Sequence, residues 1–404
     1  MNIEIRTCTS AAELRAAVAP MWHYLGRVPV DEQVAALQRV MPPHRVHTAR
    51  DGGRIIGAAG SFPFDLAVPG GRTSAAGVTL VAVLPTHRRR GILRQMMRAQ
   101  LDACHQRGEP VAYLWATEDT IYDRFGYGIA SLSAEIDLAR DRSRFYRQPE
   151  ETVRASLVPL EDAQALIAPI HQCVAARTPG MFGRTPEWWQ ARTLADPPFR
   201  RGNSGELQCA ILEDNAAPVA YALYRITPSF DRGVQTGAVQ VVEAIGNSPE
   251  ATRAIWRYVL DIDWLARVTA WLLPVDHPLL LLIAGPRRLR FSIRDGLWVR
   301  LVDVAAALRA RAYEAAHPVV IEVDDAFCPW NSGRWRVGAD GVKMTLDTPD
   351  LRCGVEALAS TYLGGFTWAQ LSRALRVDEL KPGAAGRADA LFRTPSAPWC
   401  PEIF

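Results

Sequence analysis

Val78-Thr-Leu-Val-Ala-Val-Leu-Pro-Thr-His-Arg-Arg-Arg-Gly-Ile-Leu-Arg94 is the stretch that decides how this chain folds. Its first six residues are mostly apolar and are typical of a buried strand that ends before Pro85. An amphipathic helix is predicted from about Gly91, because apolar residues recur on one face at helical spacing (Leu93, Met97, Leu101 and Cys104). The short apolar run Val111–Ala116 then predicts a second buried strand. Together these segments predict a strand–turn–helix–strand unit.

The basic turn between the first strand and the helix suits an anion. A helix start offers N–H groups without intrahelical partners and the positive end of the helix dipole. Gly91 lets a ligand approach the backbone closely, and Arg89, Arg90 and Arg94 add positive charge. No acidic residue occurs between Val78 and Leu101. The turn is therefore predicted to hold a pyrophosphate; a solvated basic turn is the alternative, since the whole chain is rich in arginine.

Composition narrows the class of protein. The 404 residues suggest two or three domains, and 49% hydrophobic with 22% charged residues is normal for a globular protein with a full-sized core. A net charge of +3 is no footprint for nucleic acid or an anionic membrane. The seven cysteines form no Cys-x-x-Cys motif, which argues against a metal cluster or a disulfide framework. The N-terminal residues carry no apolar signal core, so a cytoplasmic protein is expected. The scattered cysteines also lead us to expect no metal.

Three domains are expected along the chain, at residues 1–148, 149–286 and 287–404. In the middle one, strand Val239–Ala244 leads into a helix capped by Ser248, which hints at an internal duplication. Glu250 lies in the first turn of that helix, where it would repel an anion, so only the first domain is expected to bind a phosphorylated cofactor. Near the N-terminus, Ser10 is predicted to cap a helix that Pro20 should end.

Two long motifs resemble one family. Arg88-x-x-Gly91 matches the acetyl-CoA motif of GNAT acetyltransferases, R/Q-x-x-G-x-G/A, and Leu93 in place of the second small residue agrees with the enhanced intracellular survival (Eis) branch. The run Leu114–Gly128 looks like that family's Ile-Tyr-x-Arg-Phe-Gly-Tyr-Gly segment. The resemblance continues through two later segments to the last residue (Asp295-Gly-Leu-Trp-Val-Arg300 and Thr361-Tyr-Leu-Gly-Gly365).

This resemblance implies two α/β GNAT-type domains in tandem followed by a C-terminal sterol-carrier-protein-like α+β domain. It implies acetyl-CoA as co-substrate, with no metal, and assigns its contacts to the strand end, the basic turn and the segment after the second strand (Val81, Ala82, Val83; Arg89, Arg90, Gly91, Ile92, Leu93, Arg94; Thr117, Glu118). Thr117 stands where the family usually has Ser and keeps the hydroxyl. The family's general acid is matched by Tyr122, and its general base, a terminal carboxylate, by Phe404.

These two assignments make chemical sense. A phenol with an ordinary pKa of about 10 is protonated at neutral pH and can protonate a departing thiolate. A terminal carboxylate has a reference pKa of about 3.3–3.7, which burial would raise toward that of a useful base. The tail Ala397-Pro-Trp-Cys-Pro-Glu-Ile-Phe404 is apolar and is expected to be docked.

Other residues near these motifs have simpler interpretations. Tyr127 is expected to pack rather than to react. His87 is expected to be structural or to contact phosphate. For Glu118, capping the turn after the strand is the alternative to contacting the co-substrate. Glu402 is a possible partner for a cationic substrate, and four aromatic residues are either substrate-cleft or core residues (Trp22, Tyr24, Trp188 and Trp189).

The expected function is acetyl-CoA-dependent N-acetylation of primary amines on aminoglycoside-like or other polyamine substrates. The alternatives are an acetyltransferase for protein or peptide lysines or an amine metabolite, and a non-catalytic lipid- or sterol-binding carrier. No nucleic-acid or membrane partner is expected, and the resemblance implies a homohexamer.

Overall fold

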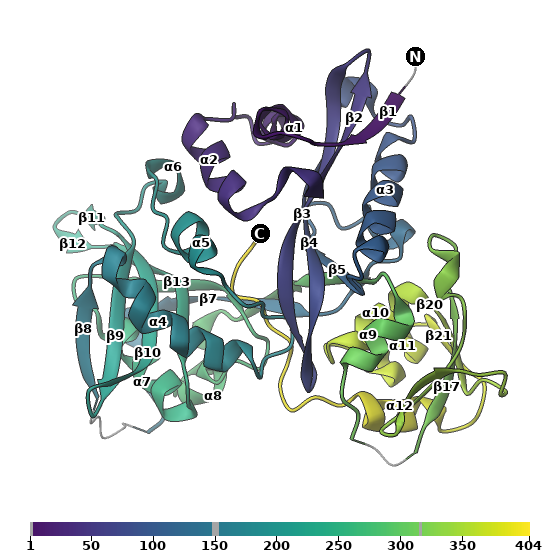
Figure 1. Ribbon diagram of the computed structural model, residues 1–404. Helices are drawn as coiled ribbons and strands as arrows, with labels where there is room; N and C mark the ends of the chain where they lie inside the picture. Colours follow the sequence, from purple (N-terminus) through teal and green to yellow (C-terminus); the bar gives the residue numbers. More distant parts are fainter. Residues whose placement is uncertain (1–2, 148–152, 315–316) are drawn as a thin grey trace. The chain divides into compact units, whose positions relative to one another are not determined.

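The computed structural model describes residues 3–147, 153–314 and 317–404, and the chain separates into two compact units (Figure 1). The first unit contains residues 1–131, 296–395 and 403–404. The second unit contains residues 132–295 and 396–402. Each unit therefore includes segments that are far apart in the sequence.

A seven-stranded sheet in the order β1-β2-β3-β4-β5-β16-β6 is the centre of the first unit. Its strands are β1 (Ile3–Thr7), β2 (Val46–Asp51), β3 (Arg54–Val68), β4 (Gly71–Val83), β5 (Val111–Trp115), β16 (Leu297–Leu301) and β6 (Gly128–Ile129). The long hairpin of β3 and β4 runs through this sheet (Figure 1). Among the described residues of this sheet, only β4 and β5 pair in parallel, and helix α3 (Ile92–Gln106) connects them, as the sequence predicts.

Two further helices, α1 (Ala11–Tyr24) and α2 (Asp31–Val40), lie between β1 and β2 in the chain. Ser10 caps α1 by accepting a hydrogen bond from the Glu13 N–H, as expected. The prediction that Pro20 ends this helix is wrong, because α1 continues to Tyr24. Pro20 is buried together with Leu14 on the packed face of α1, and this burial offsets the hydrogen bond that proline cannot donate.

The second unit repeats the same plan. Its seven-stranded sheet has the order β15-β7-β14-β13-β10-β9-β8 and one parallel pair, β13 and β14, joined by helix α7 (Pro249–Asp261). Its strands are β7 (Leu132–Ala139), β8 (Arg154–Val158), β9 (Gln208–Asp214), β10 (Ala217–Thr227), β13 (Ala238–Gly246), β14 (Arg267–Leu273) and β15 (Ser292–Asp295). A second long helix of this unit is α4 (Leu160–Ala175), and the smaller elements are α5 (Pro186–Trp188), α6 (Pro198–Arg201), α8 (Leu279–Leu282) and the hairpin of β11 (Phe230–Asp231) and β12 (Val234–Gln235).

The two large sheets exchange strands along the chain. Strand β7 follows β6 of the first sheet but pairs with β14 of the second. Strand β16 follows β15 of the second sheet but lies between β5 and β6 of the first. The chain thus passes between the sheets after Ser131 and returns after Asp295, while the three-domain division at residues 148/149 and 286/287 stays a prediction.

A third sheet of five strands, in the order β19-β18-β17-β20-β21, belongs to the first unit. Its strands are β17 (Val319–Asp324), β18 (Gly333–Gly338), β19 (Gly341–Met344), β20 (Leu351–Gly354) and β21 (Val377–Glu379). Four helices accompany them: α9 (Val304–Ala310), α10 (Val355–Tyr362), α11 (Trp368–Arg373) and α12 (Ala384–Phe392). None of the described helices is long and apolar enough to cross a lipid bilayer.

Candidate active site

Strands β4 and β5 separate in the middle of the first sheet. They pair only where Ala75–Gly77 lies opposite Val111–Tyr113, whereas β4 continues to Val83. The freed part of β4 begins with a bulge at which Leu80 has a φ of 58°, a left-handed conformation that a leucine rarely adopts. No strand in the described ranges pairs with this edge of β4 beyond Gly77, which suits an extended ligand with amide groups of its own.

The start of α3 lies directly after this strand and has the features of an anion site. Its N-cap Gly91 has a φ of 73°, provides no capping side chain, and would have nothing within 4 Å of an added Cβ. No acid lies in the first turn of α3, and Arg89, Arg90 and Arg94 are exposed. Helix α7 of the second unit differs, because Ser248 caps it and Glu250 occupies its first turn. The residues present therefore fit a pyrophosphate at α3, as the sequence argument requires, and not at α7.

The side chains of the same turn hold it against the sheet. Ile92 is buried in a cluster with Ile56 and Met96, and the partly buried Val81 and Leu93 pack against that cluster and against its neighbour around Leu101. Leu93, which departs from the general GNAT pattern, thus fills space between two core clusters. The helix start is anchored through side chains while its N–H groups remain available for a ligand.

Two residues near this turn are held by other protein groups. His87 lies 3.5 Å from the Asp51 carboxylate and 2.7 Å from the Thr86 hydroxyl, which favours the structural role. Glu118 is exposed and accepts a hydrogen bond of 2.7 Å from the Thr120 hydroxyl, a turn-capping contact that leaves the predicted contact with the co-substrate untested. Thr117 beside it is exposed.

Tyr122 lies on one face of the separating strands. It is 9% exposed and belongs to a core cluster with Val78 of β4, Leu114 of β5 and Phe125. Burial raises the pKa of Tyr122 to about 12, so its hydroxyl stays protonated at neutral pH. The ring of Tyr127 lies 5.7 Å from that of Tyr122, edge to face.

Phe404 lies on the opposite face. Successive residues of a strand point to opposite sides of the sheet, so Gly77 and Tyr113 face away from Val78 and Leu114. On that side the Phe404 ring is 4.8 Å from the Tyr113 ring and 5.1 Å from the Phe64 ring. Phe404 is 6% exposed, and an added Cβ on Gly77 would lie 3.3 Å from its ring. The tail is docked, as predicted, at the point where β4 and β5 part.

Glu402, only two residues earlier, is engaged within the second unit. Its carboxylate accepts hydrogen bonds from the Trp188 indole at 3.0 Å and the Thr193 hydroxyl at 3.2 Å, and it lies 3.0 Å from the Arg184 guanidinium. Arg184 also pairs with Glu243 at 2.5 Å. This buried network, which the sequence reasoning did not find because an isolated arginine gives no pattern, leaves Glu402 poorly placed to receive a cationic substrate.

The remaining aromatic candidates have structural contacts. The Trp22 indole donates to the Gln33 side chain at 2.9 Å. Trp189 is 2% exposed and packs in the core of the second unit. Tyr24 is the exception, because this half-exposed residue donates a hydrogen bond from its hydroxyl to the Val83 carbonyl at 2.7 Å, at the end of the freed strand.

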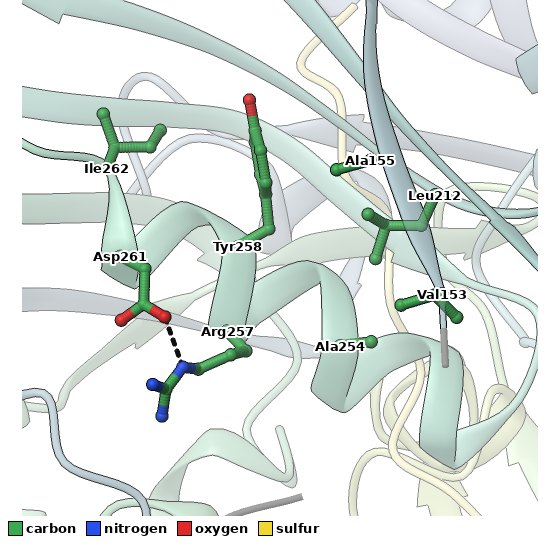
Figure 2. A pocket seen from close by; sticks show the side chains of 8 residues that line it. All are labelled: Val153, Ala155, Leu212, Ala254, Arg257, Tyr258, Asp261 and Ile262. Atoms are coloured by element: carbon green, nitrogen blue, oxygen red, sulfur yellow. Dashed lines mark hydrogen bonds and ion pairs between the residues drawn. The ribbon is translucent and has the colours of Figure 1, made fainter. Parts of the chain in front are cut away.

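A cavity in the second unit is separate from these residues. It has a volume of about 380 Å³ and lies between β8, β9 and α7 (Figure 2). Its lining is mainly apolar, with the Arg257–Asp261 ion pair and Tyr258 at its polar side. None of the residues expected to bind acetyl-CoA or to react lines it. Within the described ranges no group of three or more His, Cys, Asp or Glu side chains is arranged to hold a metal ion.

Three protein-family models match successive segments of this chain. The family model for the acetyltransferase (GNAT) domain matches residues 5–130, another GNAT-domain model matches residues 180–301, and the model for the sterol carrier protein domain matches residues 304–401. The chain is thus an N-acetyltransferase of the GNAT superfamily, with two GNAT domains and a sterol-carrier-like domain. Enzymes of this superfamily use acetyl-CoA as co-substrate.

Individual relatives narrow the family. An uncharacterized N-acetyltransferase of Streptomyces avermitilis is 42% identical over 88% of both chains. The N-acetyltransferase Eis of Mycobacterium tuberculosis is 31% identical over 89% of this chain and 90% of its own. The crystal structure of Eis1 from Mycobacterium abscessus superposes over the whole of both chains with a TM-score of 0.86 at 36% identity. The chain belongs to the Eis family of N-acetyltransferases, as the sequence motifs indicated.

Proposed function

We propose that this enzyme transfers the acetyl group of acetyl-CoA directly to a primary amine of an aminoglycoside-like or other polyamine substrate. Tyr122 is the general acid and the α-carboxylate of Phe404 is the general base. The observation that carries this proposal is the position of the two residues on opposite faces of the sheet where β4 and β5 separate. Because the amine nitrogen and the sulfur are different substituents of the acetyl carbon, a base on one face and an acid on the other can each reach its own atom.

The proposed binding residues follow the freed strand and the basic turn. The main-chain groups of Val81–Val83 would hydrogen-bond the extended arm of the co-substrate and its carbonyl oxygen. The turn from Arg89 to Arg94 would hold the pyrophosphate, with Gly91 allowing close approach. Thr117 and Glu118 would contact the co-substrate from the end of β5. Acetyl-CoA supplies the acetyl thioester.

The proton transfers balance without a covalent enzyme intermediate. The Phe404 carboxylate takes a proton from the substrate ammonium, and the free amine nitrogen then forms a C–N bond with the acetyl carbon as the C–S bond breaks. Tyr122 gives its hydroxyl proton to the departing sulfur and is reprotonated through solvent by the second proton of the nitrogen, while the proton on the Phe404 carboxyl group is released to solvent. The products are an amide and a free thiol. The burial that raises the pKa of Tyr122 also raises the pKa of a thiol beside it, so the pKa values of the general acid and of the leaving group change in the same direction.

Charge near Tyr122 supports a cationic acceptor. The turn between β5 and Tyr122 carries the exposed acid Asp119, and the exposed Asp123 follows Tyr122 directly. A polyamine with several ammonium groups gains from such a turn more than a singly charged amine does. By likeness to the family we also propose a homohexamer in the cytoplasm.

The decisive experiment measures release of free thiol from acetyl-CoA across aminoglycosides, polyamines and lysine peptides. Tyr122→Phe should lower kcat by about 10²- to 10⁴-fold, because it removes only the proton donor. Tyr127→Phe is the matched control, because its buried hydroxyl has no hydrogen-bond partner in the described part of the chain. Equal turnover of the two variants would overturn the role of Tyr122. Stabilisation by acetyl-CoA without turnover of any amine would instead indicate a carrier.

A second arm tests the general base. Residues added after Phe404 replace its carboxylate by an amide and should abolish most turnover, while binding of acetyl-CoA is retained. Unchanged turnover of the extended chain would remove the carboxylate from the mechanism.

A further inference from the structure

Phe327, from the sterol-carrier-like part of the chain, touches two parts of the proposed active site. It is 4% exposed and lies in the connection between β17 and β18. Its ring carries the Arg98 guanidinium at 4.0 Å and that of Arg94 at 5.0 Å, both from α3. The ring of Phe327 also contacts the ring of Phe125, with 5.2 Å between the ring centroids, and Phe125 lies three residues after Tyr122. All of these residues belong to the first unit.

The loop that carries Phe327 is held by a buried polar network. Arg300 of β16 donates to Asp325 at 2.6 Å, and both side chains are almost completely buried. Asp325 also accepts from the Cys328 N–H at 2.8 Å and from the Asn331 amide at 2.9 Å. Because β16 pairs directly with β5 and β6, this network fixes Phe327 to the sheet that holds the proposed site.

The turn that carries Tyr122 is built to accept this contact. Gly126 has a φ of 81°, and an added Cβ there would lie 2.4 Å from the Arg300 guanidinium. At Gly128 an added Cβ would lie 1.9 Å from the Glu356 carbonyl oxygen, at the start of α10. Both glycines of the Phe-Gly-Tyr-Gly segment are thus required by close approach of other parts of the chain, Arg300 of β16 with Val355 at Gly126 and the start of α10 at Gly128.

We propose that Phe327 is a positioning residue for acetyl transfer, which rests on the function proposed above. Its ring holds Arg94 toward the pyrophosphate through a cation–π contact, and it holds Phe125, and through it the Tyr122 turn, in place. Through Phe327 the sterol-carrier-like domain thereby acts on co-substrate affinity and on turnover, and Phe327 itself touches neither substrate.

Phe327→Leu tests this inference, because it keeps apolar volume and removes the aromatic face. Its KM for acetyl-CoA should rise about two- to fivefold, the worth of a partly exposed cation–π contact, while the KM for the amine is unchanged. Phe327→Trp retains an aromatic face and should restore the acetyl-CoA KM. The matched control is Phe392→Leu in the same domain, because Phe392 is also 4% exposed and carries the Arg311 guanidinium over its ring at 4.6 Å. It should lose comparable thermal stability with both KM values unchanged.

A double-mutant cycle with Arg94→Gln completes the test. If Phe327 acts through Arg94, Phe327→Leu should raise the acetyl-CoA KM of the Arg94→Gln enzyme by far less than that of the wild type. An unchanged KM in Phe327→Leu, or the same KM change in Phe392→Leu, would overturn the positioning role while leaving the acetyltransferase itself intact. Failure of the proposed function shows differently, as a wild-type enzyme that releases no thiol.

Discussion

Gly126→Ala should destabilise the first unit far more than the same change at another left-handed glycine. Gly126 has a φ of 81° and Gly108 a φ of 68°, so alanine at either position costs about 1–2 kcal/mol of backbone strain. At Gly108 an added Cβ meets nothing within 4 Å. At Gly126 it would lie 2.4 Å from the Arg300 Nη1 and 2.8 Å from Val355, so Arg300 must move.

Moving Arg300 disturbs a fully buried ion pair. Arg300 and Asp325 are 0% and 1% exposed, and breaking such a pair costs about 3–5 kcal/mol. The total expected for Gly126→Ala is therefore about 4–7 kcal/mol, against about 1–2 kcal/mol for Gly108→Ala. At roughly 2–4 °C per kcal/mol for a unit of this size, the thermal midpoint should fall by more than about 8 °C for Gly126→Ala and by about 2–8 °C for Gly108→Ala.

Thermal unfolding followed by circular dichroism at one fixed scan rate measures the difference between the two variants. Using one scan rate matters because large chains often unfold irreversibly, so that the midpoint then depends on the rate. Midpoints that fall equally in both variants would refute the reasoning, because they would mean that Arg300 does not pack on Gly126.

Three further predictions test other parts of the molecule. Arg89→Glu should raise the KM for acetyl-CoA more than that for the amine, because it places an acid at the start of α3; an unchanged acetyl-CoA KM would remove the pyrophosphate assignment. Burial lowers the pKa of His277 to about 3 from 6.5, so between these pH values the unfolded state binds more protons than the folded state, and the folded state loses stability as the pH falls. The thermal midpoint of His277→Asn should therefore fall less between pH 7 and pH 4 than that of the wild type. An equal fall in both proteins would contradict this. Arg184→Met leaves Glu243 and Glu402 without their shared cation, so a loss of about 3–5 kcal/mol is expected in denaturant unfolding, whereas a stability equal to wild type would show that the network is dispensable.

The local elements could be predicted because their signals are short-range. Helix α3 and strand β5 appear where the periodicity places them, and Ser248 caps α7 as expected. Pro20 shows the limit of such reasoning, because the penalty of a proline inside a helix is local while the burial that offsets it comes from packing. Periodicity and capping act within one or two turns and therefore can be read along the chain.

Some residues of the candidate site could be predicted from the sequence and others could not, for the same reason. The basic turn and the Tyr122 segment are continuous motifs, and the structure brings Tyr122 and Phe404 to the same stretch of β4 and β5. Nothing in the sequence near Arg184 or Phe327 signals their contacts, since their partners lie dozens to hundreds of residues away.

The sequence by itself determined where β4, α3 and β5 lie and which residue caps α7, and it identified the family and the turn that suits a pyrophosphate. Tertiary structure alone decided that β16 lies between β5 and β6 while β7 pairs in the other sheet, and that Arg300 and α10 press against the glycines beside Tyr122. The physical reason is that strand pairing and close packing depend on which residues are near one another in space. The local sequence of a strand or turn does not specify which distant segment will pack against it.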